Sequence, residues 1–214
     1  MAKIKNLLFD FGGVLVKIDV FKAIEAFKAL GFTDVDKELD PYVQKGFFGK
    51  LEGGVINDED FRKAVSEHCG HEVTWDDCQR AWLKIIVGVE HENLIEIQRL
   101  QSQGYQIAML SNINPFMASW FRSTDFDGLG NSLDYYIPRE HQYLSFELKN
   151  MKPRKEIFEM VLAHEGFNAD ETLFIDDGEI NLKGAQALGL HTFLPQNGEL
   201  WGKRLEQELN IVIR

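Results

Sequence analysis

The sequence has few of the features that mark secreted, membrane-spanning or nucleic-acid-binding proteins. Cysteine is scarce, with two residues among 214, which excludes a disulfide framework. Positive charge is also scarce: 23 lysines and arginines face 34 acidic residues, so the formal net charge is −11 and a nucleic acid would be repelled. No run approaches the roughly 18 apolar residues of a membrane helix, and the N-terminal MAKIKNLLFD shows no signal-peptide pattern. We expect a cytoplasmic protein that binds neither nucleic acid nor membranes.

The two cysteines, Cys69 and Cys78, lie in the string HCGHEVTWDDC together with His68 and His71. Histidine and cysteine side chains are the usual zinc ligands, but the spacing here matches no known zinc pattern. His68, Cys69 and His71 lie close together, and Cys78 is separated from them. A zinc site is therefore the less favoured interpretation. We expect a turn between helices that carries free thiols.

What the sequence has in abundance is apolar residues, 44% of the chain, in an ordered pattern. Short apolar stretches predict strands at 4–10, 105–110, 172–176 and 191–194, and two shorter extended pieces at 135–137 and 143–146. Segments with helical spacing separate the strands. Strands that alternate with helices in this way form a parallel sheet covered on both faces, so we predict a doubly wound α/β fold.

One long segment interrupts this alternation. Residues 20–88 contain no convincing strand, and their apolar residues follow helical spacing in roughly four helices, with Pro41 restarting one segment and Asn57 and Thr74 as N-caps. We therefore divide the chain into a core of residues 1–18 and 89–214 and an all-helical insertion of residues 19–88. Aromatic residues in the insertion, such as Phe47, Phe48 and Trp82, are more typical of a packed core than of a binding pocket.

Several polar residues follow the predicted strands or lie in turns, and we expect them at the same edge of the sheet. Ligands of parallel α/β sheets bind at the carboxyl ends of the strands. The side chains expected there are those of Asp10, Ser111, Asn112, Lys152, Asp176 and Asp177. Each alone is weak evidence, but together they provide carboxylates from two strands, a hydroxyl and an ammonium group.

This combination suits a phosphoryl group and a divalent cation. Carboxylates and a phosphate repel one another at contact distance unless a cation lies between them. Mg²⁺ prefers oxygen ligands and accepts few protein carboxylates. Lys152 and Ser111 would then bind the remaining phosphate oxygens, which leaves Asp10 as a nucleophile able to form an aspartyl-phosphate.

Four stretches, LLFDFGGVL, MLSN, KNMKP and LFIDDGEIN, resemble in order and spacing the four motifs of the haloacid dehalogenase-like hydrolase superfamily. The helical insertion falls where one branch of that superfamily carries a helical cap. The stretches EGGVINDEDF and YLSFELKNMKPRKEIFEMVLAHEGF look most similar to the bacterial α-D-glucose-1-phosphate phosphatase branch. The resemblance implies a magnesium-dependent phosphatase acting on a small phosphorylated metabolite, with a sugar phosphate favoured.

The resemblance also implies roles for individual residues. Asp10 matches the nucleophile, which also binds the metal, and Lys152 matches the lysine that orients nucleophile and phosphate. Ser111 and Asn112 match the phosphate-binding motif. The remaining matches are metal ligands and their support: Asp177 as a direct ligand, Asp176 as a direct or water-mediated ligand, and Asn181 beside them.

One position departs from the superfamily pattern, in which a second aspartate follows the nucleophile by two residues and serves as general acid and base. Here that position is Gly12, whose backbone carbonyl can still bind Mg²⁺ but which carries no proton. Loss of general acid–base catalysis costs a factor of ~10²–10⁴ in rate. We therefore predict a preference for good leaving groups such as those of sugar 1-phosphates; the alternative is a non-catalytic, phospholigand-binding member of the same fold.

Overall fold

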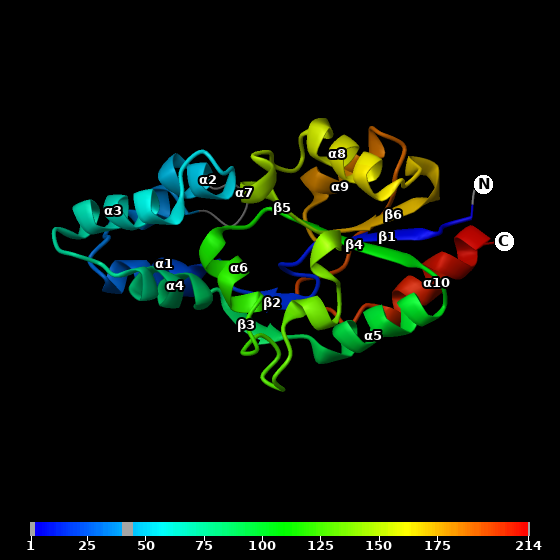
Figure 1. Ribbon diagram of the computed structural model, residues 1–214, viewed down its shortest axis with the longest axis horizontal. Coiled ribbons are helices and arrows are strands. Elements are labelled where there is room, and N and C mark those ends of the chain that lie inside the picture. Colours follow the sequence, from blue (N-terminus) through cyan, green and yellow to red (C-terminus); the bar gives the residue numbers. More distant parts are fainter. Residues whose placement is uncertain (1–2, 40–44, 214) are drawn as a thin grey trace.

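The computed structural model describes residues 3–39 and 45–213, and a five-stranded sheet organises most of them (Figure 1). All neighbouring strands are parallel, in the order β5-β4-β1-β6-β7. The strands are β1 (Asn6–Phe9), β4 (Gln106–Ser111), β5 (Gln142–Leu144), β6 (Thr172–Ile175) and β7 (His191–Phe193). Phe9 aligns with both Met109 and Ile175, so β1 and β6 end together, while β4 continues to Ser111. The predicted parallel sheet is confirmed.

Helices cover both faces of this sheet. In Figure 1, α5 (His91–Ser102) and α10 (Gly202–Ile213) lie on one side, and α8 (Lys155–Glu165) and α9 (Glu179–Gln186) on the other. Side chains of β1 alternate between the two sides: Leu7 and Phe9 belong to one buried cluster, and Leu8 belongs to the second. This alternation follows from the two-residue period of a strand and explains why Leu7, Leu8 and Phe9 are all apolar.

Short elements connect the strands. They are α6 (Pro115–Phe121), α7 (Ser145–Leu148) and three 3₁₀ turns at Leu133–Tyr135, Arg139–His141 and Ala169–Glu171. The helices α6 and α7 follow the ends of β4 and β5, whereas two of the 3₁₀ turns directly precede β5 and β6. The extended piece predicted at 135–137 is wrong, because the backbone amides of Tyr136 and Ile137 both bond the Leu133 carbonyl and close a local turn. The piece predicted at 143–146 is strand only to Leu144, after which α7 begins.

The helical insertion contains α1 (Val20–Ala29), a 3₁₀ turn (Val35–Lys37), α2 (Gly46–Glu52), α3 (Asp58–Cys69) and α4 (Trp75–Leu83). Asn57 and Thr74 are the N-caps of α3 and α4, as predicted, whereas Pro41 lies outside the described residues. Figure 1 shows these helices at one end of the molecule, beyond the ends of β4 and β5.

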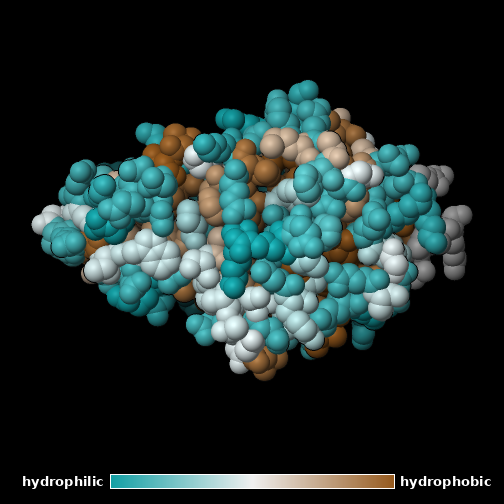
Figure 2. Space-filling model, viewed as in Figure 1, coloured by the Kyte–Doolittle hydropathy of each residue, from teal (hydrophilic) through white to brown (hydrophobic). Residues whose placement is uncertain are grey.

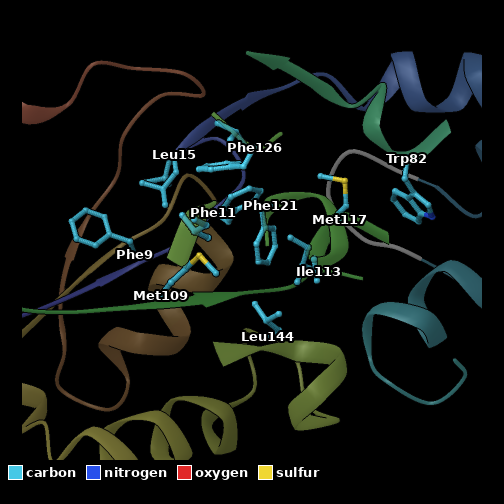
Figure 3. Close-up of a cluster of buried hydrophobic side chains, with 14 of the residues drawn as sticks. Phe9, Phe11, Leu15, Trp82, Met109, Ile113, Met117, Phe121, Phe126 and Leu144 are labelled. Atoms are coloured by element: carbon cyan, nitrogen blue, oxygen red, sulfur yellow. The ribbon is translucent and has the colours of Figure 1, made fainter. Parts of the chain in front are cut away.

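An aromatic cluster holds the insertion together. The Phe27 ring lies 5.2 Å from that of Phe48 and 5.7 Å from that of Trp82, and Phe48 lies 4.9 Å from Phe61. These four side chains are almost fully buried. Phe48 and Trp82 are therefore core residues, and Figure 3 shows Trp82 next to the apolar side chains that lead through Met117 and Ile113 toward the sheet.

A two-stranded antiparallel ribbon joins the insertion to the sheet. It consists of β2 (Val16–Ile18) and β3 (Ile86–Val89), with Val16 opposite Val89. Neither strand was predicted, because each has three or four residues and mixed exposure. The expectation that residues 20–88 contain no strand is therefore wrong at its end, where β3 begins at Ile86. The chain therefore enters and leaves the insertion at neighbouring points.

The visible surface is largely polar. The face seen in Figure 2 is mostly hydrophilic, and its hydrophobic side chains are interspersed with polar ones. Among residues 3–39 and 45–213, no helix combines the length and the apolar character needed to cross a membrane.

Candidate active site

Three carboxyl groups meet at the carboxyl ends of β1 and β6. Asp10 follows β1, Asp176 and Asp177 follow β6, and one ligand oxygen from each lies within 4.8 Å of the others. Backbone bonds fix this convergence: the Asp10 amide donates to the Ile175 carbonyl at 2.8 Å. The convergence predicted from the sequence is thus present in the structure.

Lys152 lies between two of these carboxylates. Its Nζ is 2.9 Å from Asp10 Oδ1 and 2.6 Å from Asp176 Oδ2, and the residue is 4% exposed. Burial alone would lower the pKa of Lys152, but the two carboxylates outweigh burial and raise it above its usual value. Lys152 is therefore a fixed positive charge at neutral pH, in contact with the proposed nucleophile.

Asn112 holds the main chain of Lys152 in place. Its side-chain amide donates to the Lys152 carbonyl and its side-chain oxygen accepts from the Lys152 amide, both at 2.9 Å. The family resemblance implies that Asn112 takes part in phosphate binding. That role stays a prediction, and the structure adds a positioning role which the sequence did not indicate.

Ser111 and Asn181 complete the contacts around the carboxylates. The Ser111 side chain is almost fully buried beside the Asp10 carboxyl, where it lowers the pKa of Asp10 and so favours the ionised form. The Asn181 side chain donates to Asp176 Oδ1 at 3.1 Å, and the Gly178 amide donates to the same oxygen at 2.7 Å. Asp176 is therefore almost saturated with donors, whereas Asp177 has more of its carboxylate free to bind a ligand.

Burial and the close approach of these acids raise the pKa values of Asp10 and Asp177. Burial raises the pKa of Asp10 to about 6, with the Asp176 charge adding to this and Lys152 opposing it. Burial also raises the pKa of Asp177 to about 7, followed by the charges of Asp10 and Asp176. Three carboxylates face one ammonium group, so negative charge is in excess, and an all-oxygen donor set of this kind fits a hard divalent cation such as Mg²⁺.

The two glycines that follow Asp10 and Phe11 have different surroundings. A Cβ atom at Gly12 would lie 3.4 Å from Ile18 Cδ1, an ordinary contact, so an apolar side chain of β2 occupies the space above Gly12. Gly13 has a φ of 73°, and a Cβ atom there would overlap the Asp177 carboxylate. This role of Gly13 was not predicted from the sequence, although the Gly-Gly pair was the available signal.

A cavity of about 460 Å³ borders the cluster on one side. Its lining includes Asp177, Asn197 from the loop after β7, Lys17 of β2, Asp19 between β2 and α1, and Lys22 of α1. The cavity volume lies within the range of small-molecule sites. Asp177 is therefore reachable from the side of the β2–β3 ribbon.

Comparison with known families gives one match over most of the chain. Residues 4–189 match the family model described as haloacid dehalogenase-like hydrolase. A relative from Bacteroides thetaiotaomicron, named D-ribitol-5-phosphate phosphatase, is 40% identical over 210 residues, which are 98% of each chain.

Solved structures give the same result. A predicted HAD-like family hydrolase from Porphyromonas gingivalis superimposes with a TM-score of 0.91 at 36% identity, over 97% of this chain and 98% of the other. A HAD family enzyme from Bacteroides thetaiotaomicron, crystallised with magnesium and inorganic phosphate, superimposes with a TM-score of 0.84 at 35% identity, over 94% of this chain and 98% of the other. The described fold is thus shared over nearly the full length of both structures.

Proposed function

Because the chain belongs to the haloacid dehalogenase-like hydrolases, we propose that it is a magnesium-dependent phosphatase that hydrolyses a small sugar or sugar-alcohol phosphate. The observation that carries this proposal is the position of Lys152, whose Nζ lies against both Asp10 and Asp176 in a cluster of three carboxylates. A buried carboxylate in contact with a lysine and close to a cation site is arranged for attack on an electrophile that carries negative charge.

The reaction we propose has two displacements at phosphorus. A carboxylate oxygen of Asp10 attacks the phosphorus atom, the bond to the alcohol oxygen breaks, and an aspartyl-phosphate forms. Water then attacks the same phosphorus atom, and the bond to Asp10 breaks to release inorganic phosphate. Lys152 and Ser111 bind the phosphate oxygens throughout, with Asn112 holding Lys152 and completing the phosphate-binding motif.

The residues present fit a magnesium ion. Asp10, Asp177 and the Gly12 carbonyl would hold it, Asp176 would bind it directly or through a water, and Asn181 would support Asp176. When bound, the ion neutralises the repulsion between the carboxylates and the phosphate and stabilises the charge of the transferring phosphoryl group. The close homologue crystallised with magnesium and phosphate supports this assignment.

We assign the catalytic core to residues 1–18 and 89–214 and the cap to the helical insertion, residues 19–88. The β2–β3 ribbon, which joins the two parts at one place, supports this division. A cap of this kind excludes water from the site and selects the organic part of the substrate.

The relative named D-ribitol-5-phosphate phosphatase supports a sugar-alcohol phosphate as the first substrate to test, because its sequence matches over 98% of both chains. That substrate is the ester of a primary alcohol. A sugar 1-phosphate is the second candidate, because Gly12 and the overlying Ile18 provide no proton for a poor leaving group.

A panel of phosphate monoesters with purified protein and MgCl₂ tests the proposal. It should include D-ribitol 5-phosphate, glucose 1-phosphate and p-nitrophenyl phosphate, with phosphate release as the readout. Asp10→Asn keeps the size of the side chain but removes the nucleophile, so turnover should fall by roughly 10³-fold or more. If no ester releases phosphate in an Asp10-dependent way, the phosphatase proposal fails, and isothermal titration with the same esters then tests the non-catalytic, phospholigand-binding alternative.

A further inference from the structure

Glu52 is a buried acid whose carboxyl group has no partner in the part of the chain that the structure describes. It is the last residue of α2 and is 9% exposed. Among residues 3–39 and 45–213, no hydrogen bond or ion pair reaches its side chain. An ionised carboxylate in such surroundings is unfavourable, so the group is retained at a cost in stability.

Hydrogen bonding places Glu52 beside the phosphate-binding residues. Its main-chain carbonyl accepts a hydrogen bond from Ser145 Oγ at 2.6 Å, and the same Oγ accepts from the Ile113 amide at 2.9 Å. One hydroxyl therefore joins the end of α2 to the residue that follows Ser111 and Asn112.

The two glycines after Glu52 bring this segment close to the lysine. A Cβ atom at Gly53 would lie 3.4 Å from the sulfur of Met151, the residue before Lys152, and a Cβ atom at Gly54 would overlap the Phe146 carbonyl. Residues 52–54 thus pack on the loop that carries Lys152, and Figure 1 shows α2 next to α7 at the start of this loop.

The negative charge of Asp10, the proposed nucleophile, acts on the carboxyl group of Glu52. Burial, and then the charge of Asp10, raise the pKa of Glu52 to about 8, so its carboxyl group carries a proton at neutral pH. Within the described residues, no hydrogen bond joins the carboxyl groups of Glu52 and Asp10, although the charge of Asp10 acts on Glu52. The other groups of the site are engaged: Lys152 contacts two carboxylates, and Asp177 belongs to the cation site.

The proposed reaction needs a proton donor that the first motif does not provide. Gly12 has no side chain, and the side chain above it is the apolar Ile18. A primary alcohol leaves phosphorus as an alkoxide unless it receives a proton, and an acid held near the leaving oxygen removes this barrier.

We propose that Glu52, a residue of the helical insertion, is the general acid and base of the reaction, an inference that rests on the phosphatase function proposed above. As the phosphorus–oxygen bond to the alcohol breaks, Glu52 transfers its proton to the leaving oxygen and becomes a carboxylate. In the second displacement this carboxylate takes a proton from the attacking water, the oxygen bonds phosphorus, and Asp10 is released. Glu52 ends the cycle protonated, as it began.

The decisive measurement compares two leaving groups in Glu52→Gln, which keeps the size of the side chain but transfers no proton. With D-ribitol 5-phosphate, kcat should fall by roughly 10²–10⁴-fold. With p-nitrophenyl phosphate, whose leaving group needs no proton, phosphorylation of Asp10 should stay fast while hydrolysis of the intermediate slows. The variant should therefore show a burst of about one nitrophenol per site, followed by slow turnover.

A matched pair guards against an effect on folding alone. Glu52→Asp and Glu52→Asn shorten the side chain equally, but only the aspartate can transfer a proton, so it should be the faster of the two with the alkyl ester. Glu59→Gln, on the exposed face of α3, should leave both reactions unchanged.

The outcomes separate the two proposals. If wild-type turnover does not depend on Asp10, the phosphatase proposal fails. If turnover depends on Asp10 but Glu52→Gln slows both esters equally without a burst, or slows neither, the role of Glu52 is overturned while the phosphatase stands. Equal alkyl-ester rates for Glu52→Asp and Glu52→Asn would overturn it as well.

Discussion

Gly12 and Gly13 follow the same strand, but a side chain at each position would have a different effect. At Gly12 an added Cβ atom would make an ordinary contact with Ile18. At Gly13 the backbone is left-handed, and the added atom would overlap the carboxylate of Asp177. The second glycine is therefore required by the arrangement of the carboxylates, because it lets the backbone approach Asp177, the proposed metal ligand, closely.

Gly13→Ala should consequently weaken both the fold and the metal site. A left-handed non-glycine residue costs about 1–3 kcal/mol, and the displaced Asp177 should raise the Mg²⁺ concentration needed for half-maximal activity by roughly 10-fold or more. Magnesium titrations of phosphatase activity, with urea unfolding in parallel, measure both effects. Gly12→Ala is the matched control and should change the half-maximal concentration less than about 3-fold; equal effects of the two variants would contradict this explanation.

At the scale of residues, the sequence identified those groups whose position follows from a strand end. Asp10, Ser111, Asp176 and Asp177 come directly after or at the end of apolar strands, and the structure brings them together with Lys152. It did not identify Glu52, because an acid at the end of an amphipathic helix is indistinguishable from a surface residue until the packing of α2 on α7 is known.

At the scale of elements, the start of α6 contributes both to the stability of the fold and to the position of the site residues Ser111 and Asn112. Asn114 is its N-cap, is 1% exposed and accepts a hydrogen bond from the Met117 amide at 3.1 Å. It also follows Ser111 and Asn112 within three residues, so the start of α6 fixes the loop in which these residues lie. A break in this cap leaves a buried amide without a partner.

Asn114→Ala should lower the free energy of unfolding by about 1–2 kcal/mol. Because the loop loses its anchor, kcat/KM should also fall, while the pattern of substrates is retained. Asn57→Ala, at the exposed N-cap of α3, is the control: it should cost about 0.5–1 kcal/mol and leave kcat/KM unchanged. Urea unfolding followed by circular dichroism would refute the prediction if the exposed cap proved the more costly of the two.

Helices with strong caps and long periodic patterns were predictable, and the shortest elements were not. The β2–β3 ribbon has strands of three and four residues whose pairing depends on contacts between segments about 70 residues apart. The turn at Leu133–Tyr135 depends on local amide bonds and on the buried contact between Tyr136 and Asp127. Such long-range or side-chain contacts leave no periodic pattern in the sequence.

At the scale of the whole molecule, the excess of carboxylates in the site links metal binding to stability. A cation that binds only the folded chain stabilises it by about 2.7 kcal/mol at a hundred times its dissociation constant. For a chain of this size, that corresponds to a rise in Tm of roughly 5–10 °C. Calorimetry with MgCl₂ and with NaCl at matched ionic strength should show this rise for Mg²⁺ alone, and EDTA should reverse it.

Asp177→Asn is the variant that ties this rise to the site. It removes one carboxylate of the cluster, so most of the Mg²⁺-dependent shift should disappear. A shift as large as that of the wild type would place the stabilising ion elsewhere on this acidic protein.

The ribbon of β2 and β3 has one more consequence. Because Val16 and Val89 are paired, the roughly 70 residues between them form a loop whose two ends are held together at the core. The entropy of closing a loop grows only with the logarithm of its length, so a doubling costs about 0.6 kcal/mol. The insertion can therefore lengthen, shorten or be exchanged over evolution with little penalty for the sheet, while the carboxylates to which we assign the chemistry stay where they are.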